Sequence, residues 1–166
     1  MFLKKINSDE TEKIIQLAAE IWPQTYAAIL TPEQITYMMQ MMYADEVLKL
    51  QIQNGIMFYL IYHIDQPIGF IGLEKEHKFS EDLYIHKIYI HPSQQRKGLG
   101  IKVMQEIWKI AKDLNCKSVS LNVNRNNTAK NFYEKVGFEI LKEENIDIGQ
   151  GFWMEDYVMQ YQLKNL

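Results

Sequence analysis

The stretch from Ile88 to Gly100 constrains the fold of this chain more than any other part of it. The apolar run Ile88-Tyr89-Ile90 leads into a loop with glycines at positions 98 and 100, and an amphipathic helical pattern follows. The first turn of a helix exposes unpaired backbone N–H groups at the positive end of the helix dipole. The two glycines leave those amides open to an anion. The pattern therefore predicts a phosphate-binding site at residues 96–101.

The spacing of this loop argues against two common nucleotide sites. A Walker A loop needs Gly-Lys-Ser/Thr before the helix, and Gly100-Ile101-Lys102 does not supply it. A dinucleotide fingerprint needs a third glycine three positions after Gly100, where Val103 stands. A tight strand-to-helix turn, whose glycines only allow close packing, fits the spacing as well. From spacing alone, both interpretations stay open.

The helical signals divide into four segments. Ser8 or Asp9 could cap a first helix that ends near Trp22, because proline at 23 disfavours the α conformation of the residue before it. Thr31-Pro32-Glu33-Gln34 predicts the start of a second helix that continues to about Gln53. Further helices are expected at about 98–114 and 128–136, and Gly137 suits the end of the last one.

Strand patterns occupy much of the remaining chain, at 56–64, 68–73, 83–90, 118–123, 138–148 and 157–163. Asp65-Gln66-Pro67 is a turn sequence between the first two. The order of elements predicts an α/β (α+β) fold, a mixed sheet with helices on its faces. No repeat or linker divides the sequence, so we expect one domain over residues 1–166.

Composition excludes several classes of protein. The net charge is -3 without a basic cluster, so no nucleic-acid partner is expected. Cys116 is the only cysteine, which leaves no disulfide framework and no zinc-type cluster, and we expect no metal. No apolar run has the length of a secretory signal or of a membrane span, so no membrane association is expected and the predicted location is the cytoplasm.

Two blocks of sequence resemble one known family. Gln95-Arg96-Lys97-Gly98-Leu99-Gly100 matches the Q/R-x-x-G-x-G/A signature of the GNAT acetyltransferases, and Ile88-Tyr89-Ile90-His91-Pro92 is similar to the family's preceding strand end. The segment from Asn126 to Phe138 looks like the family's N-x-x-A-x-x-F-Y-x-K-x-G-F. The resemblance implies the GNAT fold, a mixed and mostly antiparallel sheet flanked by helices.

The resemblance also implies acetyl-CoA as acetyl donor and a set of coenzyme contacts. Backbone amides of the loop would hold the pyrophosphate, and Ile88, Tyr89 and Ile90 would bind the pantetheine arm. The loop residues are Gln95, Arg96, Lys97, Gly98, Leu99, Gly100 and Ile101. Asn126 would contact the same arm, or cap the short helix. Tyr133 would protonate the departing thiolate, and its alternative role is a core aromatic beside Phe132.

The acceptor side of the reaction is less defined by the sequence. Some GNAT enzymes carry a glutamate where Tyr84 stands here. Strand alternation puts His86 on the same face as Tyr84, so His86 is the first candidate for the base, with a structural imidazole as the alternative. Glu74, acting through water, is the second. Trp22 and Tyr26 could line the acceptor site or close the core.

The whole pattern is similar to bacterial spermidine or diamine acetyltransferases, which implies transfer to a small primary amine such as a polyamine. The acidic residues Glu33, Glu74, Glu155 and Asp156 could attract such a polycation, or could be solvated. The alternatives are a non-catalytic acyl-CoA-binding module, a protein or peptide N-acetyltransferase, and a nucleotide-binding protein of another α/β fold. Residues 146–157 predict a β-hairpin first and a homodimer contact second.

Overall fold

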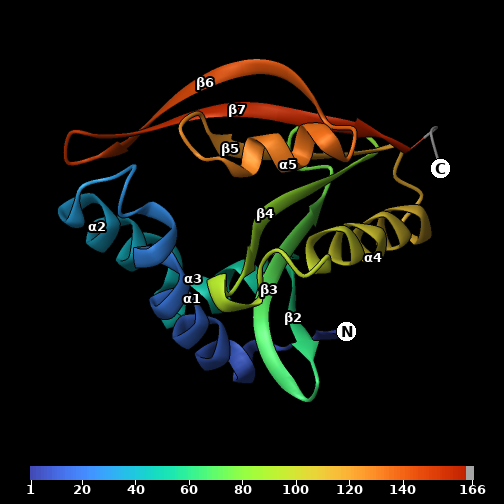
Figure 1. Cartoon of the computed structure of the whole chain (residues 1–166), viewed down its shortest axis with the longest axis horizontal. Helices are drawn as coiled ribbons and strands as arrows, with labels where there is room; N and C mark the ends of the chain where they lie inside the picture. Colours follow the sequence, from blue (N-terminus) through green and yellow to red (C-terminus); the bar gives the residue numbers. More distant parts are fainter. Residues whose placement is uncertain (164–166) are drawn as a thin grey trace. The chain divides into compact units, whose positions relative to one another are not determined.

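The computed structural model describes residues 1–163, which form the helices and strands in Figure 1. The helices are α1 (Thr11–Tyr26), α2 (Pro32–Tyr43), α3 (Asp45–Gln53), α4 (Leu99–Asp113) and α5 (Ala129–Lys135), with short 3-10 turns η1 (Ser8–Glu10) and η2 (Pro92–Gln94). The strands are β1 (Phe2–Lys5), β2 (Met57–His63), β3 (Gln66–Lys75), β4 (Asp82–Ile90), β5 (Ser118–Asn124), β6 (Glu139–Gly149) and β7 (Phe152–Gln162).

The strands are ordered β1-β2-β3-β4-β5-β7-β6. The start of β4 pairs in parallel with β5, whereas β1–β2, β2–β3, β5–β7 and β6–β7 are antiparallel. This arrangement confirms the predicted mixed, mostly antiparallel sheet. The hairpin predicted near the C-terminus is also confirmed, because β6 and β7 pair along their length and turn at Gly149–Phe152.

The chain divides into two compact units. Unit 1 contains Met1–Glu74 and Lys87–Glu106, and unit 2 contains Lys75–His86 and the chain from Ile107 onwards. In unit 1, α1, α2 and α3 lie side by side (Figure 1), and the buried side chains include Ile14, Ile21, Trp22, Phe58 and Phe70. In unit 2, α5 lies against β5, and the buried side chains include Leu83, Val119, Leu121, Val158 and Met159.

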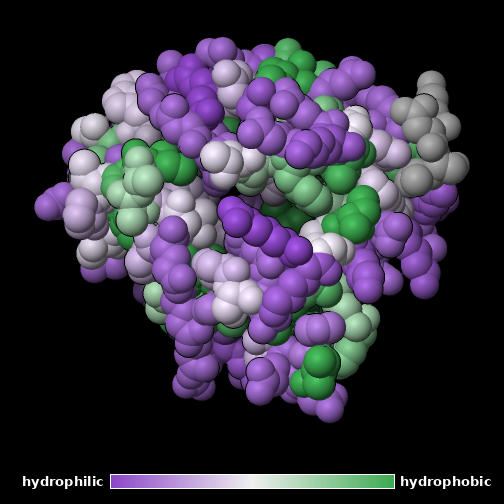
Figure 2. Space-filling model, in the orientation of Figure 1, coloured by the Kyte–Doolittle hydropathy of each residue, from purple (hydrophilic) through white to green (hydrophobic). Residues whose placement is uncertain are grey.

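The face of the protein in Figure 2 is largely polar. Hydrophilic residues cover most of the face in Figure 2, and hydrophobic residues show between them in smaller patches. No helix within residues 1–163 combines the length and the hydropathy that a membrane-spanning segment needs.

The first helix extends further than the sequence predicts. The expected end near Trp22 is wrong, because α1 continues through Pro23 to Tyr26. A proline inside a helix removes one backbone donor, but its carbonyl can still accept. Here the amide of Ala27 donates to the Pro23 carbonyl at 3.1 Å, and the Thr25 hydroxyl donates to the Ile21 carbonyl at 2.9 Å. These bonds complete one more helical turn.

The predicted second helix is two helices. Its start is confirmed, since the side chain of Thr31 accepts a hydrogen bond from the Gln34 amide at 3.2 Å. The chain then leaves the helical conformation at Ala44, with φ -60° and ψ 143°, and α3 begins at Asp45. Long-range contacts hold both sides of the break, because Tyr43 bonds to Trp22 and Asp45 accepts from the Thr11 hydroxyl.

Strand β1 at the N-terminus is absent from the predicted order of elements. Phe2–Lys5 pairs antiparallel with β2, with Phe2 opposite Tyr62. The rings of this pair stack with their centroids 5.1 Å apart. A short, mostly exposed strand of this kind carries too little hydrophobic periodicity to be recognised locally.

Candidate active site

The predicted phosphate loop lies in unit 1, between β4 and α4. Gln95, Arg96, Lys97 and Gly98 are exposed, whereas Leu99 is buried at the start of the helix. Gly98 has φ +72°, and a Cβ atom built there would meet nothing within 4 Å. The backbone conformation favours glycine at this position, and the space that a side chain would occupy is open. Such a loop ahead of a fifteen-residue helix can accommodate an anion.

Ile88, Tyr89 and Ile90 form the end of β4, directly before the loop. The Gln95 side chain donates to the Ile90 carbonyl at 3.0 Å, which ties the loop to the strand. The strand also passes very close to β3, since a Cβ on Gly69 would lie 2.1 Å from the Tyr89 carbonyl oxygen. Only glycine at 69 allows this approach, so the neighbouring strand fixes the position of the backbone at residues 89 and 90.

The predicted acceptor residues Trp22 and Tyr26 lie together in unit 1, and Tyr89 joins them. The ring of Trp22 is 4.5 Å from that of Tyr26 and 5.9 Å from that of Tyr89, centroid to centroid. The hydroxyl oxygens of Tyr26 and Tyr89 are 3.0 Å apart. Tyr89 thus presents its side chain to the residues expected to line the acceptor site, a contact that the sequence did not indicate.

Buried Tyr43 completes this aromatic cluster. The Trp22 indole nitrogen donates to the Tyr43 hydroxyl at 2.9 Å, and Tyr43 is also hydrogen-bonded to Tyr89. Burial raises the pKa of Tyr43 well above that of an exposed phenol, so this hydroxyl stays protonated. Because an indole N–H can only donate, the Tyr43 oxygen accepts the bond from Trp22. The cluster is a connected network of hydroxyl groups.

Lys87 is a buried cation next to this cluster, and the sequence reasoning missed it. Its side chain is only 7% exposed. The ammonium donates to the Gln51 side chain at 3.2 Å and lies 5.5 Å from the Tyr43 ring and 5.6 Å from the Phe58 ring. Burial lowers the pKa of Lys87 to about 8. Nothing in the local sequence distinguishes this lysine from the exposed ones.

Tyr133 and Asn126 belong to unit 2. Tyr133 is buried on α5, with its ring 5.5 Å from Phe132 and 5.7 Å from Phe138. Asn126 is exposed, and its predicted alternative role as helix cap is wrong. The side chain of Asn127 accepts from the Ala129 amide at 2.9 Å instead, because the helix begins one residue later than expected.

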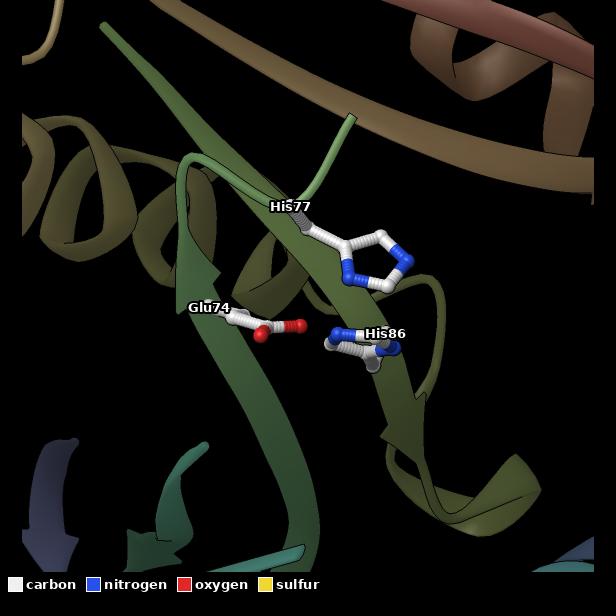
Figure 3. Close-up of side chains that lie close together, drawn as sticks. All are labelled: Glu74, His77 and His86. Atoms are coloured by element: carbon white, nitrogen blue, oxygen red, sulfur yellow. The ribbon is translucent and has the colours of Figure 1, made fainter. Parts of the chain in front are cut away.

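His86 lies on β4 within a group of three rings in unit 2. Its centroid is 4.7 Å from Tyr84 and 4.5 Å from His77, and His77 is 4.8 Å from Tyr84. Figure 3 shows His77 and His86, together with Glu74 of β3. An imidazole pair can relay protons or contribute nitrogen ligands to a metal ion.

A polar network crosses β4, β5, β6 and β7 in the same unit. The Lys78 ammonium donates to the Glu144 carboxylate at 2.7 Å and to the Asn122 side-chain oxygen at 3.0 Å. Tyr84 also donates to that oxygen, at 3.1 Å, and the Asn122 amide donates to Glu144 and to Asp156. Hydrogen bonds from Lys142 and Lys78 lower the pKa of Glu144 to about 2, so it is ionised at neutral pH. Of this network, the sequence reasoning identified Asp156 alone as a candidate for binding a cation.

Comparison with known proteins agrees with this fold and loop. The model of the acetyltransferase (GNAT) family matches residues 13–138. Spermidine N(1)-acetyltransferase of Thermoplasma acidophilum is 30% identical over 159 residues, and the match covers 92% of this chain and 94% of that protein.

Solved structures give the same assignment. The PaiA N-acetyltransferase of Thermoplasma acidophilum, solved in complex with coenzyme A, has a TM-score of 0.79 at 26% identity and covers 97% of this chain and 98% of its own. A GCN5-related N-acetyltransferase of Rhodopseudomonas palustris shares the fold, with a TM-score of 0.80 at 17% identity over 97% of this chain and 94% of its own. The chain therefore belongs to the GNAT acetyltransferase family and is an acetyl-CoA-dependent acyltransferase.

Proposed function

We propose that the protein transfers the acetyl group of acetyl-CoA directly to a primary amine of a small molecule, and that this acceptor is a polyamine. The observation that carries the proposal is the 30% identity to a spermidine N(1)-acetyltransferase over 92% of the chain. The open loop at Gly98 supports the donor part of the proposal, because its geometry suits a pyrophosphate group.

The coenzyme is assigned to the residues that the sequence predicts. The amides of Arg96 to Ile101 hold the pyrophosphate, with Gln95 tied to the strand end. Backbone groups of Ile88, Tyr89 and Ile90 bind the pantetheine arm as an added strand, with Asn126 as a further contact. Each of these assignments comes from the family resemblance, and the exposed loop supports the first of them.

The chemistry requires a base and an acid. An alkylamine with a pKa of about 10.4 is only ~0.04% neutral at pH 7, so it must lose a proton before it attacks the thioester. His86 is the proposed base, and Glu74, acting through water, is the alternative. The amine nitrogen then forms a bond to the acetyl carbon, the carbon–sulfur bond breaks, and Tyr133 gives its proton to the departing thiolate. The nitrogen releases its second proton as the amide forms, and this proton restores the Tyr133 phenol. Trp22 and Tyr26 are proposed to line the acceptor site.

The experiment that tests this function is an acceptor screen. Thiol release from acetyl-CoA would be measured with spermidine, diamines, amino acids, peptides and aminoglycosides, against a baseline without acceptor. We expect turnover with the polyamines above that with the other classes. Turnover only with peptides would replace the proposed acceptor by a protein substrate, and binding of acetyl-CoA without turnover for any amine would support a non-catalytic module.

A further inference from the structure

The side chain of Lys78 occupies a site that is built to hold an ammonium group. Three groups of unit 2 surround its nitrogen: the Glu144 carboxylate at 2.7 Å, the Asn122 amide oxygen at 3.0 Å and the face of the Tyr84 ring, with its centroid 5.3 Å away. We call Tyr84, Asn122 and Glu144 the ammonium site. A carboxylate, a neutral oxygen acceptor and an aromatic face are the groups that recognise a primary alkylammonium.

The strands hold this site in place independently of Lys78. Tyr84 donates to Asn122 at 3.1 Å, and the Asn122 amide donates to Glu144 at 3.1 Å. Lys78 itself lies in the turn segment 76–81, outside any helix or strand, and its side chain is 21% exposed. The site therefore belongs to the sheet, whereas the cation in it comes from a loop.

A second carboxylate faces the same site. Asp156 is only 3% exposed, and it is the strand neighbour of Glu144. Its one direct bond here is from the Asn122 amide, at a long 3.3 Å. Burial raises the pKa of Asp156, because removal from water destabilises the ionised carboxylate and one long hydrogen bond offsets little of that loss. An additional cation at this position would reduce that cost.

We propose that the ammonium site binds a primary ammonium group of the acceptor, and that Lys78 fills the site until the acceptor displaces it. This inference rests on the proposed function and adds to it the location of the non-reacting amine. The ring of Tyr84, which forms one wall of the site, lies against His86, the proposed base. A diamine or polyamine could thus place one amine in the ammonium site and another beside the base, which a monoamine cannot do.

The test is steady-state kinetics with putrescine, a diamine, and propylamine, a monoamine. Lys78→Met removes the competing ammonium and keeps most of the length of the side chain. We expect its KM for putrescine to fall about 10-fold, because the Lys78–Glu144 ion pair is partly buried and competes more strongly than an exposed pair, and its KM for propylamine to stay unchanged. Lys78→Arg keeps the competing charge, and its KM for putrescine should not fall.

The chain offers a matched control in Lys142. Its ammonium binds the other oxygen of the same Glu144 carboxylate at 2.8 Å, and its side chain is 56% exposed. Lys142→Met removes a cation from Glu144 and leaves Lys78 in the ammonium site, so KM for putrescine should stay near the wild-type value. An equal fall in both methionine variants would show a general charge effect and overturn the proposal, as would an unchanged KM in Lys78→Met.

Calorimetry separates failure of this inference from failure of the proposed function. If no amine is acetylated, the proposed function fails, and the ammonium site is then tested by titrating putrescine into the wild type and Lys78→Met. Tighter binding to the variant supports displacement. Equal binding refutes it. Glu144→Gln in the Lys78→Met background should abolish the gain, and thermal melting of each variant verifies that it folds.

Discussion

Lys87 provides a direct test of the packing in unit 1. Lys87 is only 7% exposed, and no carboxylate within residues 1–163 forms an ion pair with its ammonium. Gln51 and the rings of Tyr43 and Phe58 compensate the charge in part. Replacement of Lys87 by methionine keeps most of the side-chain volume and removes the buried charge. We expect Lys87→Met to be more stable than the wild type at pH 7.

The size of this effect follows from the pKa of Lys87, which falls from 10.5 to about 8 on folding. At pH 7 the group is protonated in both states, and the shift corresponds to about 3 kcal/mol of lost stability. Between pH 8 and 10.5 the unfolded chain binds more protons than the folded one, so stability rises with pH in this window. At pH 9.5 about 1.5 kcal/mol of the loss remains.

The assay is urea unfolding of both proteins at pH 7.0 and pH 9.5, followed by far-UV circular dichroism. The free energy of unfolding of Lys87→Met should exceed that of the wild type at pH 7.0, and this difference should be about 2 kcal/mol smaller at pH 9.5. Lys102→Met, at an exposed position on α4, serves as control and should show no such narrowing. A gap that is independent of pH, or a wild type that is more stable than Lys87→Met at pH 7, would refute the reasoning.

Four further predictions test other parts of the molecule. Gly98→Glu should abolish acetyl-CoA binding in a calorimetric titration, because it strains a residue at φ +72° and adds a carboxylate to the phosphate site; wild-type affinity would remove the loop from the coenzyme site. Tyr133→Phe should lower kcat by ~100-fold or more and leave acetyl-CoA binding unchanged, whereas unaltered turnover would leave Tyr133 a packing role only. Gly69→Ala should destabilise the fold by about 2 kcal/mol or more in urea, since its Cβ would collide with the Tyr89 carbonyl, and a neutral effect would contradict the close approach of the strands. Thr31→Ala should cost about 1 kcal/mol in thermal melting through loss of the helix cap, and equal melting temperatures would show that the cap bond contributes nothing.

Signals that lie close together in the sequence predicted the fold well. Thr31 and Pro32 mark the start of α2, and Gly137, at φ +100°, follows α5 as its pattern requires. The break at Ala44 could not be predicted, because alanine favours helices and no glycine or proline is present there. The contacts that hold the break are those of Tyr43 with Trp22 and of Asp45 with Thr11. They connect residues 21 and 34 positions apart, so a local pattern does not reveal them.

The same distinction applies to the candidate site. The loop between β4 and α4 could be predicted, because its glycines and the helix that follows are adjacent in the chain. The ammonium site could not, because Tyr84, Asn122 and Glu144 come from three strands. Lys87 has no signal either, since only packing by α2, α3 and β2 distinguishes it from an exposed lysine.

The positions of the tryptophans allow fluorescence to report on each of the two units separately. Of its three tryptophans, Trp22 lies in unit 1, whereas Trp108 and Trp153 lie in unit 2. Trp22 is buried and bonded to Tyr43, and Trp153 is 49% exposed on the terminal hairpin. Fluorescence of a Trp108→Phe/Trp153→Phe protein would report on unit 1 alone, and fluorescence of Trp22→Phe on unit 2 alone. Stopped-flow traces of the two proteins would therefore show which unit assembles first.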